Sequence, residues 1–316
     1  MKSLKLTLQE TAMKIKTAEK ILVTAHINPD GDALGSTLAM CQVLRQFGKI
    51  AQVYIDDKLP TNLNFLPHIN EIKRPAENEK FDADLLLVID TAPDRIGSIR
   101  NLTDAQILNI DHHVTNKNET DDLYLEHTAA AACEIIFKLC KELGVKITPD
   151  IATCLYTGIV TDTGFFNYSN TTPTTFRVAA ELVEYGVKPN YISEQVERRK
   201  LNDVKVMIAA LQTMQIYFNE KVAGMFIDEE LSKVVDTTEG LVDLIRVIDT
   251  VDVAFVLTYK AENLVRASLR SKGVNVSEIA QKMGGGGHIR AAGCTFHTSF
   301  DEAKNILLQT LGEYFD

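Results

Sequence analysis

The sequence has no apolar run that approaches the roughly 20 residues of a membrane span. Segment 1–20 has an amphipathic helical pattern and lacks the apolar centre of a signal peptide. We therefore expect a cytoplasmic protein without a membrane partner. No G-x-G-x-x-G follows a predicted strand, and neither G-x-x-x-x-G-K nor G-x-S-x-G occurs. These absences argue against dinucleotide-binding, P-loop and α/β-hydrolase sites.

Cysteine and positive charge are also scarce. No C-x-x-C occurs, and the neighbours of the five cysteines are mostly apolar: Cys41, Cys133, Cys140, Cys154 and Cys294. This pattern predicts buried free thiols in a reducing compartment, with no role in metal binding. The 33 Lys and Arg residues against 43 Asp and Glu residues give a net charge of −10, which argues against binding of long duplex nucleic acid. Small anionic ligands remain compatible with this charge, because divalent cations can reverse the sign of a local site.

The sequence does contain alternating strand-like and helical patterns. Strand-like runs occur at 21–26, 51–55, 83–91 and 106–111, and helical patterns at 32–48, 129–144, 152–162 and 172–186. This interleaving predicts an α/β fold, with an open, mostly parallel sheet and helices on both faces. The pattern resets after about residue 217 into a smaller α/β domain. We expect an N-terminal domain at 1–190, a helical linker at 191–217 and a C-terminal domain at 218–316.

Acidic residues and histidines gather in four segments of the N-terminal domain. Three of these segments follow predicted strands, and the carboxyl ends of parallel strands can meet at one crevice. The residues are His26, Asp30 and Asp32 in HINPDGD, Asp90 in VID, Asp111, His112 and His113 in DHH, and Asp162 in TGIVTDTGFF. We therefore expect one site that draws on all four segments.

So many carboxylates cannot share a crevice uncompensated, because like charges raise one another's pKa. Metal ions are the natural compensation, and oxygen and imidazole ligands without thiolates suit Mn²⁺, Mg²⁺ or a similar ion. Two such ions about 3.5 to 4 Å apart can clamp the attacking and leaving oxygens of a phosphoryl displacement. The alternative for each acid taken alone is a helix cap or a turn, as for Asp30 before Gly31.

A glycine run, GGGGH at 284–288, precedes a predicted strand in the C-terminal domain. The segment RASLRS, with Arg266 and Arg270, lies a short distance upstream. Glycines let backbone N–H groups approach an anion, and arginine can bind a phosphate through two hydrogen bonds. We favour a phosphate-binding loop over the alternative, a structural turn.

In this order and spacing, HINPDGD, VID, DHH and TGIVTDTG resemble the four motifs of the DHH phosphoesterase superfamily. RASLRS followed by GGGGH resembles its DHH-associated C-terminal domain, so the resemblance runs from about residue 15 to the end. It implies a catalytic domain at 1–190 and a substrate-binding domain at 218–316. It also implies two divalent cations per chain, Mn²⁺ first with Mg²⁺ or Co²⁺ as alternatives, and a homodimer formed through the N-terminal domain.

The resemblance also implies a role for each matching residue. One ion would be held by His26, Asp30 and Asp90, and the other by Asp32, Asp90, His112 and Asp162, with Asp90 as the bridge. His113 would face the substrate phosphate and stabilise charge or protonate the leaving oxygen, while Asp111 would orient the histidines. The substrate's other phosphate would be bound by Arg266, Ser268, Arg270, Gly285, Gly286, Gly287 and His288.

Within the superfamily, we find no membrane module, no added oligonucleotide-binding domain and no S-R-K-K-Q signature of family II pyrophosphatases. The remaining resemblance is to the compact bifunctional type. Such enzymes degrade very short RNA (nanoRNA) to mononucleotides and remove the 3′-phosphate of adenosine 3′,5′-bisphosphate (pAp). One alternative is hydrolysis of the dinucleotide pApA or of cyclic di-AMP. Another is a non-catalytic nucleotide-binding protein, which the presence of every expected ligand disfavours.

Overall fold

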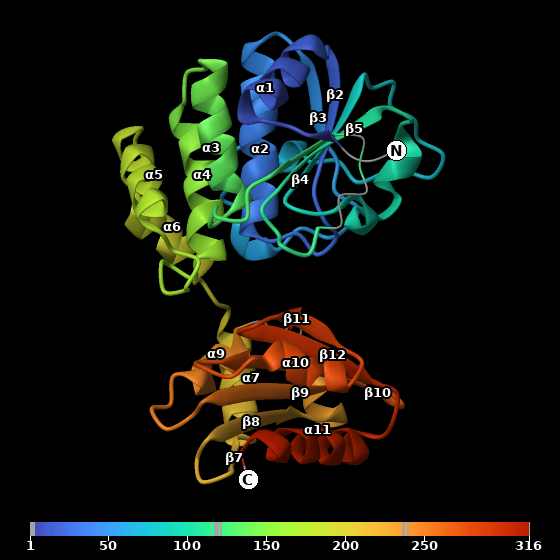
Figure 1. Ribbon diagram of the computed structural model, residues 1–316, viewed down its shortest axis with the longest axis vertical. Helices are drawn as coiled ribbons and strands as arrows, with labels where there is room; N and C mark the ends of the chain where they lie inside the picture. The colour runs from blue at the N-terminus through green and yellow to red at the C-terminus, as the bar shows by residue number, and fades with distance from the viewer. Residues whose placement is uncertain (1–3, 117–119, 121, 236–237, 239, 316) are drawn as a thin grey trace. The chain divides into compact units, whose positions relative to one another are not determined.

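The computed structural model describes residues 4–116, 120, 122–235, 238 and 240–315. The chain divides into two compact units, Met1–Arg198 and Arg199–Asp316, each with its own sheet and apolar core (Figure 1). In the range 191–217, expected as a helical linker, the structure has the end of α6 (Pro189–Val196), then α7 (Leu201–Gln212) and β7 (Gln215–Tyr217). Within the described residues, no helix is both long and apolar enough to span a membrane.

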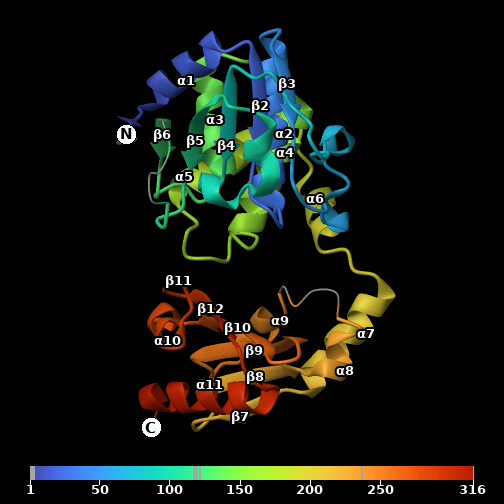
Figure 2. The same ribbon diagram turned by 90° about the vertical axis from the view of Figure 1, so that its right-hand side faces the viewer.

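The first unit contains a six-stranded sheet in the order β1-β6-β5-β4-β2-β3, in which all neighbouring strands are parallel (Figure 2). The strands are β1 (Leu4–Lys5), β2 (Lys20–Thr24), β3 (Ile50–Val53), β4 (Leu85–Ile89), β5 (Gln106–Asp111) and β6 (Asp122–Leu125). The predicted parallel sheet is therefore confirmed. The pattern missed β1 and β6: β1 has only two residues and shows no periodicity, and β6 is a four-residue strand that begins with the acidic Asp122.

One face of this sheet is covered by α-helices, with α5 and α6 packed outside α4 (Figure 1). The helices are α1 (Leu8–Thr17), α2 (Gly31–Gln46), α3 (Ala132–Leu143), α4 (Pro149–Asp162), α5 (Pro173–Glu184) and α6. Leu87 of β4 faces this helical layer, whereas Leu86 and Val88 face a second core. Ile99 and Leu102 of the 3-10 helix η4 (Gly97–Leu102) cover that second core. Helices thus lie on both faces, but the second face has a 3-10 helix in place of the α-helices of a doubly wound sheet.

Glycines allow α2 and α4 to approach each other closely. A Cβ atom at Gly35 of α2 would lie 2.4 Å from the Cys154 carbonyl oxygen of α4. A Cβ atom at Gly158 of α4 would lie 2.8 Å from Asp32 Oδ1 of α2 and 2.2 Å from Cys133 Sγ of α3. Cys133 and Cys154 border this contact, and all five cysteines are free and buried as predicted. The contact fixes the first turn of α2 against the last turns of α4, where the predicted site residues lie.

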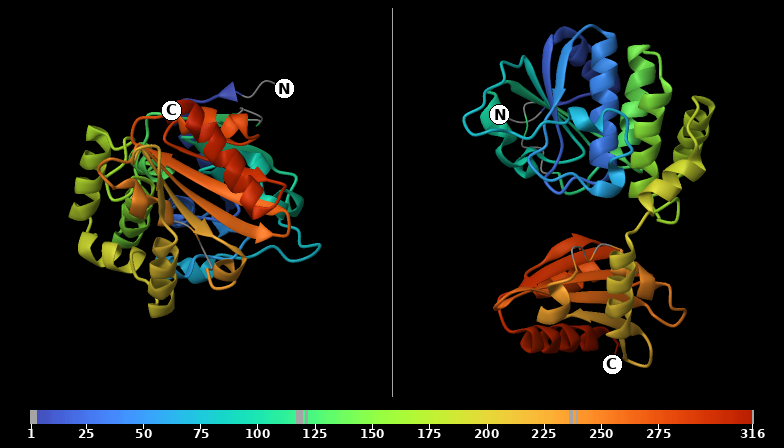
Figure 3. Two further views of the ribbon diagram at one scale, coloured as in Figure 1. Left: turned by 90° about the horizontal axis from the view of Figure 1, so that it is seen from below. Right: turned by 180° about the vertical axis from the view of Figure 1, so that it is seen from behind.

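The second unit contains a six-stranded mixed sheet in the order β11-β12-β10-β9-β8-β7, in which only β8 and β9 are parallel among the described pairs. Its further strands are β8 (Val222–Ile227), β9 (Val253–Ala261), β10 (Leu264–Ser271), β11 (Gly286–His288) and β12 (Ala291–Phe296). Helices α10 (Val276–Lys282) and α11 (Phe300–Phe315) pack on one face (Figure 3). Helices α7, α8 (Glu229–Ser232) and α9 (Leu241–Arg246) pack against β8 and β9 on the other, so the predicted smaller α/β domain is confirmed.

Substitution of Gly35 by alanine is expected to lower the melting temperature. Alanine favours a helix over glycine by about 1 kcal/mol. The new methyl group would nevertheless meet the carbonyl oxygen of Cys154, which belongs to the backbone and cannot rotate away, and such overpacking costs about 1–3 kcal/mol. Thermal unfolding followed by circular dichroism measures the balance. The control is Gly273→Ala, because a Cβ atom there meets only Arg290 Nη1 at 3.8 Å. An unchanged or raised melting temperature for Gly35→Ala would contradict the close contact.

Candidate metal centre

The structure brings the predicted acidic residues and histidines together at the carboxyl ends of β2, β4 and β5. Asp162 joins them from a helix, as the last residue of α4. Three groups have possible ligand atoms within 4.8 Å of one another: His26–Asp30–Asp90, Asp32–His112–Asp162 and Asp90–His112–His113. Only Asp111 is absent from these groups, which were sought among the described residues.

Asp90 belongs to the first group and also faces His112 of the second group. Its Oδ2 is 3.6 Å from His26 Nε2, and its Oδ1 is 3.3 Å from His112 Nε2, so the two oxygens face different histidines. The residue is buried, and its backbone is left-handed with φ of 64°, a conformation that costs a residue other than glycine about 1–3 kcal/mol. A hydrogen bond from the Asp90 N–H to the Ile110 carbonyl (2.9 Å) holds this turn at the end of β4.

The two histidines that face Asp90 are oriented by backbone carbonyls. His26 Nδ1 lies 2.9 Å from the Ile27 carbonyl oxygen, and His112 Nδ1 lies 3.2 Å from that of Ala129. Because a carbonyl oxygen only accepts, each Nδ1 must carry the proton. In a neutral imidazole the Nε2 lone pair then points at the carboxylates. This tautomer is the one that a metal ligand requires.

Asp30 and Asp32 are also helix caps. The Asp30 Oδ1 accepts hydrogen bonds from the N–H groups of Asp32 and Ala33, both at 3.0 Å, and Asp30 is the N-cap of α2. The carboxylate of Asp32 accepts from the N–H groups of Ala132 (2.6 Å) and Cys133 (2.9 Å) in the first turn of α3. Capping does not exclude the site, because Asp30 Oδ2 still lies 3.9 Å from His26 Nε2.

Glycines inside the motifs make room for this arrangement. A Cβ atom at Gly31 would lie 2.3 Å from Thr161 Oγ1, in the residue before Asp162. A Cβ atom at Gly158 would lie 2.8 Å from Asp32 Oδ1. The glycines of HINPDGD and TGIVTDTG therefore let α2 and α4 bring their acidic residues to His112, whose Nε2 is 3.7 Å from Asp162 Oδ2.

The charges of the site are strongly coupled. Burial and the neighbouring charge of Asp90 raise the pKa of Asp32 to about 7. Burial alone would lower the pKa values of His26 and His112, but the nearby carboxylates outweigh it and raise them to about 9 and about 10. The same histidines hold the pKa of Asp90 below its usual range despite its burial. Without metal, the carboxylates are therefore balanced by protons on the histidines.

The donor atoms fit a divalent cation. Asp90 Oδ1 and His112 Nε2 are buried and have no hydrogen-bond partner within the described residues. An orphaned buried polar atom is unfavourable, and a metal ion would satisfy both atoms at once. Carboxylate oxygens with imidazole nitrogens suit hard to borderline ions. These residues form groups that could bind metal.

The carboxylate of Asp111 holds the ring and the backbone N–H of His113 by hydrogen bonds. Its Oδ1 accepts from the N–H and the Nδ1 of His113 at 3.2 and 2.8 Å, and its Oδ2 accepts from Asn116 Nδ2 at 2.7 Å. Asn116 Nδ2 also donates to Asn109 Oδ1 (2.8 Å), and Asn109 Nδ2 donates to the Thr91 carbonyl (2.7 Å). Sequence reasoning missed Asn109 and Asn116. The available signal was an asparagine inside the apolar strand ILNID.

The predicted substrate-binding residues lie in the second unit, most of them on one face of its sheet. Ser268 pairs with Gly293, which pairs with Gly286, and Arg270 pairs with Ala291, which pairs with His288. Directly paired residues point to the same side of a sheet, and residues two apart on a strand do so too. The shared face therefore carries Arg266, Ser268, Arg270, Gly286 and His288.

Part of the glycine run is strand β11, so the run is not a simple loop. A Cβ atom at Gly285 would lie 2.2 Å from the Gly293 carbonyl oxygen. Gly287 has φ of 144° and pairs with Ala292, on the opposite face from Gly286. The neighbouring backbone is therefore too close for any side chain at positions 285 and 287. A Cβ atom at Gly286 would meet nothing within 4 Å, so this glycine leaves open space on the face that also carries Ser268.

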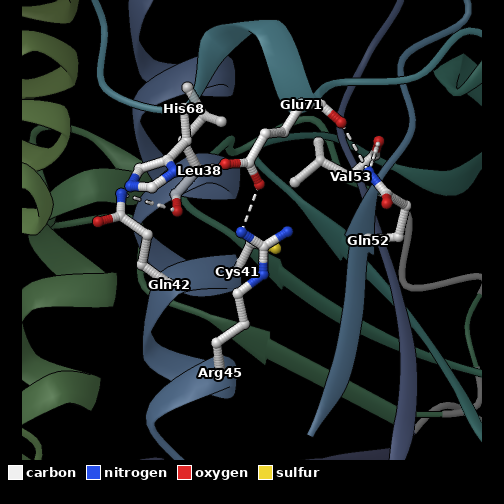
Figure 4. Close-up of a pocket in the computed structure, with 8 residues that line it drawn as sticks. All are labelled: Leu38, Cys41, Gln42, Arg45, Gln52, Val53, His68 and Glu71. Atoms are coloured by element: carbon white, nitrogen blue, oxygen red, sulfur yellow. Dashed lines mark hydrogen bonds and ion pairs between the residues drawn. The ribbon is translucent and has the colours of Figure 1, made fainter.

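A small pocket elsewhere in the first unit contains none of the predicted site residues (Figure 4). It lies beside α2 and β3, and its volume is about 10 Å³. Its polar groups bind one another, since Arg45 donates to Glu71, His68 Nδ1 lies 2.6 Å from Glu71 Oε1, and Gln52 donates to the Glu71 carbonyl at 2.7 Å. A space of this size holds at most a water molecule.

Comparisons with known proteins find matches over both units of the chain. The family model described as "DHH family, N-terminal domain" matches residues 20–159, and the "DHHA1 domain" model matches residues 203–316. A Thermus thermophilus protein named bifunctional oligoribonuclease and PAP phosphatase NrnA is 35% identical over 295 residues, covering 93% of this chain and 89% of that protein. A Bacillus subtilis protein of the same name is 30% identical over 310 residues, covering 96% and 97%.

Two solved structures are informative about the fold. The exopolyphosphatase-related protein from Bacteroides fragilis is 25% identical, with a TM-score of 0.90 over 97% of this chain and 96% of that one. The RecJ protein of Thermus thermophilus in complex with Mn²⁺ is 14% identical, with a TM-score of 0.57 over 95% of this chain and 54% of that one. The likeness to RecJ concerns the fold alone.

Substitution of Asp90 by asparagine is expected to weaken Mn²⁺ binding by more than about 100-fold. Loss of a residue that only hydrogen-bonds to a metal ligand already costs about 10- to 100-fold. Asparagine keeps the size of the side chain and tolerates the left-handed backbone of this position, so the fold should survive. Isothermal titration with Mn²⁺ measures the loss, and circular dichroism checks the fold. The exposed Asp104 provides the control, Asp104→Asn. Wild-type affinity in Asp90→Asn would contradict a central role for Asp90.

Mn²⁺ affinity is expected to rise between pH 6 and pH 8. The raised pKa values of Asp32, His26 and His112 mean that an ion must displace protons, and higher pH removes these protons in advance. Each displaced proton changes the affinity by about tenfold per pH unit. Calorimetry in two buffers of different ionisation enthalpy counts the released protons. An affinity that is constant over this range would contradict the proton-balanced site.

Proposed function

The chain belongs to the DHH family, and on that basis we propose that it is a divalent-metal-dependent phosphoesterase that degrades short oligoribonucleotides to mononucleotides and removes the 3′-phosphate from pAp. The names of the Thermus thermophilus and Bacillus subtilis relatives support this pair of activities. The observation that carries the proposal is the Asp90 carboxylate, whose two oxygens face different histidines. This placement suits a bridge between two ions in a phosphoesterase.

We assign two ions to the site, each held by one of the close groups together with Asp90. The first would be held by His26, Asp30 and Asp90, and the second by Asp32, Asp90, His112 and Asp162. The absence of thiolate ligands from this set favours Mn²⁺, with Mg²⁺ or Co²⁺ as alternatives. When bound, such ions act as Lewis acids on a phosphoryl group and lower the pKa of water.

We assign proton transfer to His113. Burial would lower the pKa of His113, but its hydrogen bond to Asp111 and the charge of Asp90 raise it overall. A raised pKa favours the protonated imidazole, and this form can stabilise negative charge or donate a proton to the leaving oxygen. Asp111 is a positioning residue in this scheme, because it binds His113 Nδ1 and fixes the orientation of the ring.

We assign the second phosphate of the substrate to the second unit. Arg266, Ser268, Arg270 and His288 share one face of the sheet there, and Gly286 leaves open space on the same face. Two phosphate sites suffice for pAp or a dinucleotide. The net charge of −10 supports this choice, because a long nucleic acid would need an extended basic track.

The test is hydrolysis of 5′-labelled di-, tri- and twelve-nucleotide RNA and of pAp by the full chain, with Mn²⁺ and with chelator. We expect metal-dependent loss of the shortest RNAs and of pAp. His113→Asn should reduce kcat by about 10²- to 10⁴-fold, the usual contribution of a general acid or base. His297→Asn is the matched control, because His297 is exposed and lies in the second unit.

Other outcomes would redirect the proposal. Inertness toward these four substrates with cleavage of pApA or cyclic di-AMP would retain the chemistry and replace the substrate. Binding of nucleotides by folded, Mn²⁺-loaded protein without hydrolysis of any of them would show that the chain is not an enzyme.

A further inference from the structure

A cavity of about 230 Å³ lies beside the metal centre, within the first unit. Its lining includes residues 91–95, which directly follow Asp90, and residues from the 111–116 segment, which begins at the end of β5. His113 belongs to this lining, and its Nδ1 is 3.8 Å from Asp90 Oδ1. A group bound in the cavity would therefore be adjacent to a phosphate held at the metal centre.

The lining contains few planar side chains on which a nucleobase could stack. Bases stack on aromatic rings or on the planar guanidinium group of arginine. Among the described lining residues there is no Phe, Tyr or Trp, which leaves His113 and Arg95. The ring of His113 already lies against that of His112, with centroids 4.5 Å apart, and its Nδ1 is bound to Asp111. Arg95 is the remaining planar cation.

A hydrogen bond holds the backbone of Arg95 in place, and its side chain has no partner among the described residues. Its carbonyl oxygen accepts a hydrogen bond from the Ile27 N–H at 2.9 Å, which ties the 3-10 helix η3 (Pro93–Arg95) to the segment after His26. The residue is exposed, and its guanidinium makes no hydrogen bond or ion pair with any residue that the structure describes. It is therefore available to a ligand.

The charges and the apolar surface of the cavity favour a neutral ring over a second phosphate. Asp94 and Asp111 line the cavity together with Arg95 and His113, so the acidic groups offset the basic ones and leave no excess positive charge for a second phosphate. Ala92 and Pro93 contribute apolar surface, which a base can cover. Apolar surface beside polar groups that can orient a ligand is typical of a small-molecule site.

We propose that this cavity holds the nucleobase of the nucleotide whose phosphate lies at the metal centre, and that the Arg95 guanidinium stacks on that base. The inference rests on the proposed function and adds a base-binding residue to it. Every base has a π-face, so stacking tolerates all four. An enzyme that clears short RNA of any sequence needs this tolerance.

The test is Arg95→Lys, which keeps the positive charge and removes the planar group. We expect the KM for pAp to rise by about 5- to 100-fold, the usual effect of losing one base-stacking contact. The KM for ribose 3,5-bisphosphate, which is pAp without its base, should not rise with it. Arg100→Lys is the matched control, because Arg100 lies in η4, donates to the Ala105 carbonyl at 2.9 Å and does not line the cavity.

Equilibrium binding separates this inference from the proposed function. Calorimetry with AMP and with ribose 5-phosphate, in the presence of Mn²⁺, needs no turnover. The wild-type protein should prefer AMP, and Arg95→Lys should lose that preference, even if neither protein hydrolyses pAp. An unchanged preference for AMP in Arg95→Lys would overturn the inference and leave the proposed function intact. Equal weakening of AMP and ribose 5-phosphate would show that Arg95 contacts phosphate, which would also overturn base stacking.

Discussion

The geometry of the site depends on the carboxylate of Asp90. Its two oxygens face His26 and His112, which come from different strand ends, so the residue couples two halves of the site. The backbone at Asp90 is left-handed, and the end of β4 holds it in this conformation through Ile110. Backbone strain at such a point is typical of functional sites, where the surrounding structure fixes a geometry that the chain alone would avoid. The parallel sheet supplies that fixed frame.

The sequence was sufficient to predict the parts of the site that follow from sheet topology. His26, Asp90 and His112 follow separate strands, and parallel strands must end at the same edge. Only the motif TGIVTDTG predicted that Asp162 belongs to the site, because Asp162 lies at the end of a helix and not of a strand. The position of Asp162 depends on how closely α2 and α4 approach each other. Gly35 of α2 and Gly158 of α4 make this close approach possible. Spacing along the chain contains no information about that contact.

Other features depend on tertiary contacts that no local pattern encodes. Asn109 acts through Asn116, seven residues later, and only the folded chain shows that the two meet beside Asp111. Arg95 is an ordinary exposed residue in the sequence, and the cavity beside it gives it significance. The glycine run was predicted as a loop for a phosphate. In the structure the glycines have different roles. The close approach of β12 requires a glycine at position 285, whereas Gly286 has open space beside it.

The buried thiol of Cys133 has a consequence for which ions the site accepts. Its Sγ lies 3.7 Å from the Asp32 backbone oxygen, so a sulfur atom sits close to a centre built from oxygen and nitrogen donors. Burial, together with the charge of Asp32, raises the pKa of this thiol well above its usual value. Only a thiolate competes for zinc or copper, and here the sulfur keeps its proton. A thiol that keeps its proton adds no sulfur ligand, so the donor atoms gathered at the site remain oxygen and nitrogen.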